Sequence, residues 1–145
     1  MARGQALFGF VRFWSRRWTG AGLGADGQRG RDVMVVEAVH TLAGQRQPTS
    51  VNDVARELGL DQSGASRMVT GAEQRGLVVR RVPGRVGAAS AVSTTAAGEE
   101  LLRQAHAWQD DVLGRLTAGW PDEDVETLIV LMERLVRAQN AIDSV

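Results

Sequence analysis

The sequence has 145 residues, 43% of them hydrophobic, which suits one domain with a packed core. It contains no cysteine, which excludes disulfides, thiol redox chemistry and thiolate metal sites. The formal net charge is zero, so no overall positive charge marks the chain as a nucleic-acid binder.

Residues 5–18 predict an amphipathic helix rich in aromatic side chains. Apolar residues recur on one stripe at steps of three and four: Leu7, Val11, Trp14 and Trp18. Arg12 interrupts the apolar run and no small-residue cleavage site follows, so the segment does not fit a signal peptide. A helix lying on a membrane surface is an alternative. We favour burial against the rest of the protein or a second subunit, because exposed aromatic surface is unfavourable in water.

Residues 19–30 predict a glycine-rich loop. Gly22-x-Gly24-x-x-Gly27 formally matches a dinucleotide-binding fingerprint, but that fingerprint needs a preceding strand, and a helical pattern precedes it here. The loop is therefore not assigned to nucleotide binding. Residues 31–43 then predict a helix that starts at a cap on Asp32 and ends at Gly44.

The segment from Ser50 to Leu77 predicts two short helices around a tight turn. Ser50 with Asp53 resembles a capping box, Gly59 is the expected stop of the first helix, and Asp61 can cap the second. The second helix, Asp61–Arg75, has an apolar face of Ala65, Met68, Val69 and Ala72. Its other face carries small polar groups and one long arginine: Gln62, Ser63, Ser66, Arg67, Thr70 and Gln74. Hydroxyls, amides and arginine are the groups that read base edges and phosphates, so we predict a DNA-recognition helix.

A β-hairpin is predicted directly after this helix. Val78–Val82 is rich in β-branched residues and alternates with arginine, Pro83-Gly84 marks a turn, and residues 90–94 supply a returning strand. A helix-turn-helix followed by a hairpin is the order of a winged helix, with Arg85 near the tip of the wing. The predicted fold class is mainly α with a small β-hairpin wing.

Two long helices complete the predicted fold. Thr95 is a suitable N-cap for a helix that runs to about Gly119, and a last helix runs from about Asp122 to about Ala141. The apolar band of the last helix is wider than one neighbour needs, which favours burial on two sides, one of them against another subunit. Its members are Leu128, Ile129, Leu131, Met132, Leu135, Val136 and Ala138.

The charges are unevenly distributed along the chain. Residues 62–95 carry five arginines against one glutamate, whereas residues 96–145 carry ten acidic residues against four arginines. A basic middle favours a localised anion-binding surface. The chain has no lysine and much alanine, glycine, arginine and valine, which indicates GC-rich coding and a bacterial source.

The order of these elements, together with four short motifs, resembles the MarR family of bacterial winged-helix regulators. The motifs are Asp53-Val54-Ala55-x-x-Leu58, Ser63-x-x-Ser66-Arg67, Glu73-x-x-Gly76-Leu77-Val78-x-Arg80 and Thr95-x-x-Gly98-x-x-Leu101. The resemblance covers about residues 30–140. It implies one MarR-like domain over 1–145, with a winged helix-turn-helix lobe at about 31–95 and dimerisation helices at 5–18 and 96–145.

The resemblance also implies a function. A cytoplasmic homodimer would bind double-stranded DNA at a pseudo-palindromic operator, act as a repressor and, as in many members, respond to a small ligand. Members usually carry an Asp-x-Arg pair in the wing, which Val86-Gly87-Ala88 lacks here. Arg85 is the nearest replacement.

The expected contacts follow from these positions. Ser63, Ser66, Arg67 and Thr70, together with Gln62, would face base edges and phosphates, whereas Arg80, Arg81 and Arg85 would mainly bind phosphate. The alternatives are a solvated surface position for Arg67 and acidic partners on the protein for Arg80 and Arg81. The candidate effector-binding residues are Trp14, Trp18, His40 and Trp108, for which packing in the core is the alternative.

We predict no cofactor, metal or catalytic site, because no ligand set with zinc spacing and no nucleophile with a base is present. A winged-helix module that binds proteins, with weak or no DNA binding, is the alternative function. The missing wing pair and the zero net charge favour that alternative.

Overall fold

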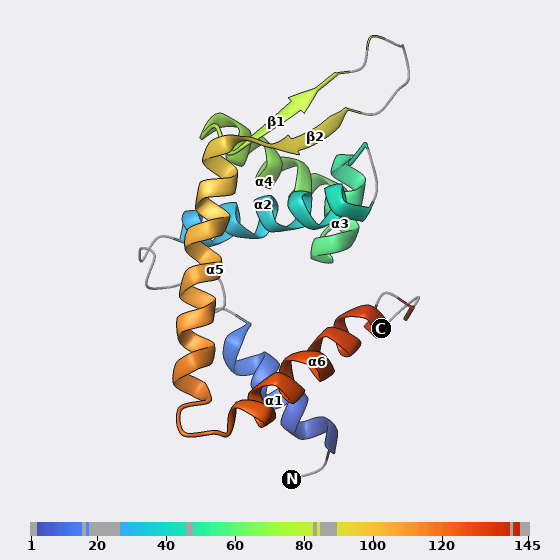
Figure 1. Cartoon of the computed structure of the whole chain (residues 1–145). Helices are drawn as coiled ribbons and strands as arrows, with labels where there is room; N and C mark the ends of the chain where they lie inside the picture. Colours follow the sequence, from blue (N-terminus) through green and yellow to red (C-terminus); the bar gives the residue numbers. More distant parts are fainter. Residues whose placement is uncertain are drawn as a thin grey trace. The chain divides into compact units, whose positions relative to one another are not determined.

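The computed structural model describes residues 3–15, 17, 27–45, 48–82, 84, 90–139 and 141–142. Within these residues the chain forms α-helices and one antiparallel hairpin (Figure 1). Their bounds are α1 Arg3–Trp14, α2 Gly27–Gln45, α3 Val51–Leu58, α4 Gln62–Gln74, β1 Val78–Arg81, β2 Ala91–Thr94, α5 Ala96–Leu116 and α6 Asp122–Gln139. The predicted fold class is confirmed. Residues 1–109 form one compact unit and residues 110–145 a second, with α5 contributing to both.

The core of the first unit is built around α2. Val33, Val35, Val36 and Val39 have no exposed surface, and α3, α4, the hairpin and the first half of α5 pack around them. Their apolar side chains point in several directions because the helix has neighbours on more than one side. In α5, Leu102 is buried beside Leu101 and Ala105.

The predicted helix ends in the helix-turn-helix are confirmed. The Ser50 hydroxyl accepts from the main-chain N–H of Asp53 at 3.1 Å, and the Asp53 carboxylate accepts from that of Ser50 at 2.8 Å. Gly59 ends α3 with a φ of 64°, the left-handed conformation that glycine adopts at least cost. Asp61 caps α4 by accepting from the Gly64 N–H at 2.6 Å.

The hairpin is fixed at its base to α4 and α5. Val78 pairs with Thr94 and Arg81 with Ala91, and the Thr95 hydroxyl donates to the Gly76 carbonyl at 2.6 Å. Thr95 also caps α5, as predicted, by accepting from the Gly98 N–H at 3.1 Å. A Cβ at Gly98 would lie 2.2 Å from the Leu77 carbonyl oxygen, so α5 can approach β1 this closely only with glycine there.

Two predicted boundaries are wrong. α2 begins at Gly27, so the last four residues of the predicted loop are helical and Asp32 is not a cap. Asp32 lies in the second turn, where it is 5% exposed and bonded to Arg75, and this tertiary contact compensates for its burial. α1 ends at Trp14 rather than at residue 18, and the Ser15 hydroxyl bonds to the Arg12 carbonyl, a local bond that competes with helix continuation. Trp18 lies outside the described residues.

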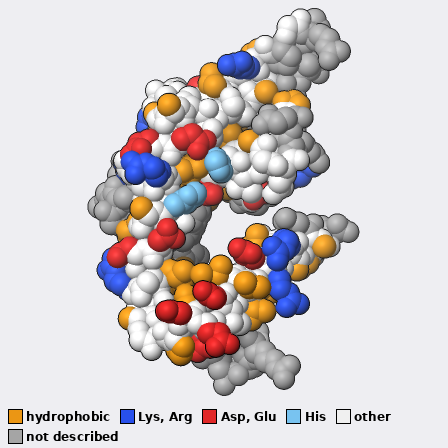
Figure 2. Space-filling view, viewed as in Figure 1, with side chains coloured by type: hydrophobic (Ala, Val, Ile, Leu, Met, Phe, Trp, Pro, Cys, Tyr) orange, Lys and Arg blue, Asp and Glu red, His pale blue; other side chains and the backbone are white. Residues whose placement is uncertain are grey.

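α6, in the second unit, has no buried residue. The apolar residues of its band from Ile129 to Val136 are 39–53% exposed, and Figure 2 shows hydrophobic side chains gathered at the surface over this helix. The predicted burial on two sides is therefore not present within the described part of the chain. None of the described helices is both long and apolar enough to cross a bilayer.

Candidate nucleic-acid interface

The two faces of α4 separate as the sequence predicts. Ala65, Val69 and Ala72 are buried against the lobe, and Met68 packs beside them. The polar residues lie on the opposite side. Gln62, Ser63 and Arg67 are exposed, and Ser66 and Thr70 are partly buried. This solvent face therefore combines hydroxyl, amide and guanidinium groups on one helix that is held by its apolar side.

A shallow polar cavity of about 240 Å³ lies where α4 meets the start of α3. It brings together three predicted site residues, Gln62, Ser66 and Arg80. The remaining lining residues are Ser50, Val51, Asn52 and Ser90, which were not among the predicted site residues. Ser50, Val51 and Asn52 lie at the start of α3, where main-chain N–H groups favour an anion, whereas Ser90 directly precedes β2.

Arg80 is held partly inside the protein. Its Nη2 donates to the Thr70 hydroxyl at 3.1 Å, and its main-chain N–H donates to the Glu73 carboxylate at 3.0 Å. Its Nε is buried 3.9 Å from Glu73, too far for a hydrogen bond, and has no hydrogen-bond partner within the described residues. The contact with Glu73 corresponds to the alternative in which acidic groups of the protein neutralise part of its charge.

Arg81 points away from Arg80. The strand register places Arg80 opposite the buried Val92 and Arg81 opposite Ala91, so successive side chains lie on opposite faces of the hairpin. Arg81 is exposed. Arg85 and the segment 86–88 lie outside the described residues.

The positive charge of residues 62–95 is smaller in the structure than in the sequence. Arg75 donates from Nε and Nη2 to both carboxylate oxygens of Asp32, at 2.7 and 2.6 Å. Arg67 and Arg81 take part in no ion pair within the described residues. Arg67 is therefore the α4 cation that remains available to an external anion.

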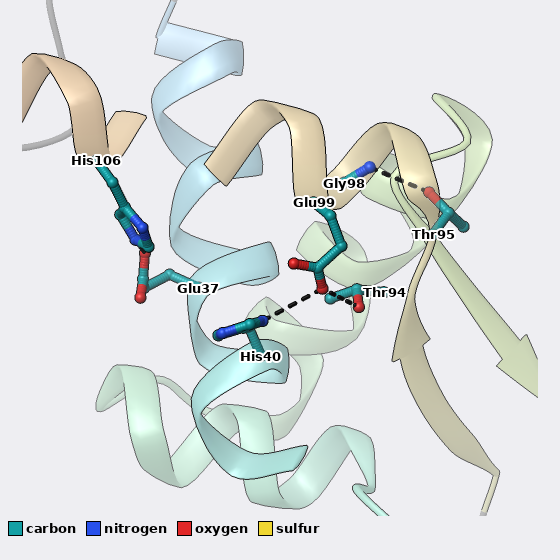
Figure 3. A network of polar contacts seen from close by, with 7 residues as sticks. All are labelled: Glu37, His40, Thr94, Thr95, Gly98, Glu99 and His106. Atoms are coloured by element: carbon teal, nitrogen blue, oxygen red, sulfur yellow. Dashed lines mark hydrogen bonds and ion pairs between the residues drawn. The ribbon is translucent and has the colours of Figure 1, made fainter. Parts of the chain in front are cut away.

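Both histidines link α2 to α5 (Figure 3). His40 Nδ1 lies 3.2 Å from Glu99, and His106 Nε2 lies 2.7 Å from Glu37. The Thr94 hydroxyl donates to Glu99 at 2.5 Å and, with His40, holds the pKa of Glu99 below its usual range. His40, predicted as a candidate effector contact, is thus engaged by an acidic residue of its own lobe.

Two other candidate effector residues meet. The rings of Trp14 and Trp108 pack edge to face with their centroids 6.4 Å apart, and Phe13 and Phe10 lie beside Trp14. Such packing is what aromatic residues supply in a core as well as in a ligand site. Among the described residues, no group of three or more acidic or histidine side chains could hold a metal ion.

Residues 30–87 match the model of the MarR family, which spans the helix-turn-helix and the wing. Solved structures extend the similarity to nearly the whole chain. A MarR-family transcriptional regulator from Rhodococcus sp. RHA1 is 25% identical, with 93% of this chain and 95% of that chain covered and a TM-score of 0.64. No curated protein matches the sequence significantly.

Two further structures contain ligands. CouR from Rhodococcus jostii RHA1, bound to p-coumaroyl-CoA, is 24% identical, with 100% of this chain and 98% of that chain covered and a TM-score of 0.64. The MepR–DNA complex of S. aureus is 16% identical, with 92% of this chain and 94% of that chain covered and a TM-score of 0.58. At these identities the two structures show the shared fold. The predicted resemblance to MarR-family regulators is confirmed.

Proposed function

We propose that the chain is a sequence-specific DNA-binding transcriptional regulator of the MarR family, whose model matches residues 30–87 with the helix-turn-helix. It would act as a repressor in the bacterial cytoplasm, as a homodimer on a pseudo-palindromic operator. No catalytic step is part of this function.

The solvent face of α4 carries the proposal. It presents Ser63, Ser66 and Thr70 hydroxyls and the Gln62 amide around Arg67, with no acidic residue in the helix before Glu73. An α-helix fits the major groove of B-DNA, where arginine binds guanine through two hydrogen bonds and hydroxyls bind bases or phosphates. We assign the base contact to Arg67.

Phosphate contacts surround this helix. Arg81 is exposed on the other face of the hairpin, and the polar cavity beside α4 offers a cationic surface made of Arg80, Ser66 and the start of α3. Arg85 would continue that surface towards the tip of the wing. Such contacts fix the register of a protein on DNA but do not read its sequence.

Dimerisation would bring two such helices to one operator. The exposed apolar residues of α1 and α6 supply surface for a second copy, and two-fold symmetry would then present the recognition helices to sites about 34 Å apart, one turn of DNA. The proposed effector contacts are Trp14, Trp18, His40 and Trp108. The ring contact between Trp14 and Trp108 and the liganded CouR structure support a site of this kind.

One observation favours a second candidate function, a winged-helix module that binds proteins. Asp32 neutralises Arg75, and Glu73 lies against Arg80, so the lobe has less free positive charge than its sequence suggests. Salt dependence separates the two functions, because DNA binding releases counterions and protein binding through apolar contacts does not.

The test is binding of the purified chain to its own promoter region at several salt concentrations. The logarithm of affinity should fall linearly with the logarithm of salt, with a slope that corresponds to several phosphates. Arg67→Ala should weaken operator binding by about 1–3 kcal/mol and relax specificity at one base pair. Arg115→Ala removes an arginine whose side chain is 71% exposed in the second unit and should change neither.

A chain that ignores its promoter region at low salt would refute the regulatory function. An equal loss on all DNA sequences with Arg67→Ala would instead make Arg67 a phosphate contact.

A further inference from the structure

The C-terminal end of the recognition helix is fastened to α2 by one charged pair. Arg75 is the C-cap of α4, and its planar guanidinium meets both oxygens of Asp32 through two parallel hydrogen bonds of 2.7 and 2.6 Å. Two parallel bonds fix an angle as well as a distance. The two residues are 43 positions apart in sequence, so their bond is a long-range contact between α2 and the end of α4.

The environment of Asp32 makes the pair costly to break. The carboxylate is 7% exposed, whereas the Arg75 side chain is 36% exposed. A buried carboxylate without its partner loses hydration and gains nothing in return. The cost of leaving the Asp32 carboxylate unpaired therefore favours the inward orientation of Arg75, away from a nucleic acid on the opposite face of α4.

Gly71 makes room for this arrangement. A Cβ at Gly71 would lie 2.7 Å from Nη2 of Arg75 and 3.5 Å from its Cζ. The guanidinium thus lies across the helix backbone one turn before its own residue. Glycine is unfavourable in the interior of a helix, so its presence in the middle of α4 is explained by the path that Arg75 takes to Asp32.

The rest of the contact between α4 and α2 gives little angular control. The other directional contacts of α4, from Thr70 and Glu73 to Arg80, join it to the hairpin and not to α2. The buried residues of α4 are Ala65, Val69 and Ala72, which are small and leave a smooth surface. Ridges of larger side chains would set the crossing angle of two helices, and small ones set it weakly. The directional constraint on this side of α4 comes from the charged pair.

We propose that Asp32 and Arg75 are positioning residues, which set the orientation of the recognition helix and thereby the affinity and specificity of the proposed DNA binding. Arg67 lies eight residues before Arg75, a distance of about 12 Å along the helix axis. A tilt of roughly 10° about the Arg75 end would displace Arg67 by about 2 Å, enough to break hydrogen bonds to a base edge. Neither residue needs to touch DNA for this effect.

The first experiment measures DNA binding of the full chain with Asp32→Asn, Arg75→Gln and the double variant. Each single variant should weaken operator binding at least about tenfold, leave binding to unrelated DNA unchanged and keep the salt slope of the wild type. The double variant should bind the operator no more weakly than the single variant with the lower affinity, because both substitutions remove the same interaction. Arg103→Gln is the matched control, since it removes the same charge from an exposed bidentate pair with Glu100.

Three results would overturn the proposal. Unchanged operator affinity in both single variants would exclude a positioning role. A salt slope lowered by about one in Arg75→Gln alone would show that Arg75 contacts a phosphate. A lower melting temperature with full operator affinity below it would show a role in stability only.

A second experiment does not depend on DNA, and so it separates this proposal from the proposed function on which it rests. The chain has no cysteine, so Ser63→Cys in α4 and Gln45→Cys in α2, both exposed positions, can carry one pair of spin labels per chain. Mixing with an excess of unlabelled chain leaves the distance within one chain as the main signal. The distance distribution between them should broaden or shift with Asp32→Asn and with Arg75→Gln, but not with Arg103→Gln. An unchanged distance distribution in the variants would refute the positioning role, even if the wild type binds its operator. A changed distribution would support the positioning role, even if the wild type does not bind its operator.

Discussion

The lobe around α2 and the helix α6 place their apolar side chains in opposite ways. In the lobe, Val33, Val36 and Val39 have no exposed surface, whereas in α6 Leu131, Leu135 and their neighbours remain about half exposed. The lobe thus buries its hydrophobic surface within one chain. α6 has an apolar band that its own unit leaves exposed to solvent.

The difference indicates where each region obtains its stability. Burial of apolar surface contributes about 25 cal/mol per Å², so the lobe has this contribution as a monomer and α6 lacks it until something covers the helix. Exposed apolar patches of this kind are typical of interaction surfaces. In the proposed dimer, a second copy of the chain would cover this band.

The largest expected effect comes from charging the apolar band of α6. Leu131→Glu together with Leu135→Glu places four unpaired carboxylates in a two-fold interface and should cost about 6 kcal/mol or more of association free energy. Analytical ultracentrifugation at micromolar concentration should then give a monomer where the wild type gives a dimer. Arg137→Glu adds the same side chain outside the apolar band and should remain dimeric.

A wild-type chain that sediments as a single species of monomer mass would show that no second copy covers α6. The exposed band of α6 would then need another partner.

An intermediate effect is expected in the core of the lobe. Leu102→Ala, at a position only 2% exposed, should lower the free energy of unfolding by about 2–5 kcal/mol through lost burial and a cavity. Leu131→Ala, at a position 46% exposed, should change it by less than about 0.5 kcal/mol once values are extrapolated to low protein concentration. Chemical denaturation followed by circular dichroism measures both. Equal losses would mean that α6 is buried within its own chain.

Much of the fold was predictable because its signals are local. The capping box of Ser50 and Asp53, the stop at Gly59 and the cap at Thr95 depend on residues three or four apart, and all are confirmed. The start of α2 was not predictable, because Asp32 resembles a cap in sequence. Only its bond to Arg75, far along the chain, shows that it is an interior residue.

The candidate site was predictable to a similar extent. The outward face of α4 follows from helical periodicity, so Arg67 and Ser63 lie where the sequence places them. The bond of Arg75 to Asp32 and the contacts of Arg80 with Thr70 and Glu73 depend on tertiary packing. The spacing of residues in the sequence does not predict them. A count of arginines therefore overstates the charge offered to an anion.

The smallest expected effect concerns Glu99 at the junction of α2, β2 and α5. Its pKa is lowered chiefly by the Thr94 hydroxyl, so the ionised carboxylate favours the folded state. This contribution is complete above the ordinary pKa of glutamate and is lost as the pH falls through the lowered value. Thr94→Val should raise the pKa of Glu99 towards its ordinary value and weaken this part of the acid sensitivity of the lobe.

NMR titration of the side-chain carboxyl groups measures this change. The pKa of Glu100, which is lowered mainly by Arg103, should stay the same in Thr94→Val and serves as the internal control. A Glu99 pKa that does not move would show that the Thr94 hydroxyl does not stabilise the carboxylate.

The close approach of Gly98 to the Leu77 carbonyl has a genetic consequence. Every missense change of a glycine codon adds a side chain, and here the first atom of that side chain would lie 2.2 Å from a main-chain oxygen that cannot rotate away. Each such allele must push the first strand of the wing away from the start of α5. The codon for residue 98 is therefore a place where random mutagenesis should recover loss-of-function alleles regardless of which amino acid is introduced.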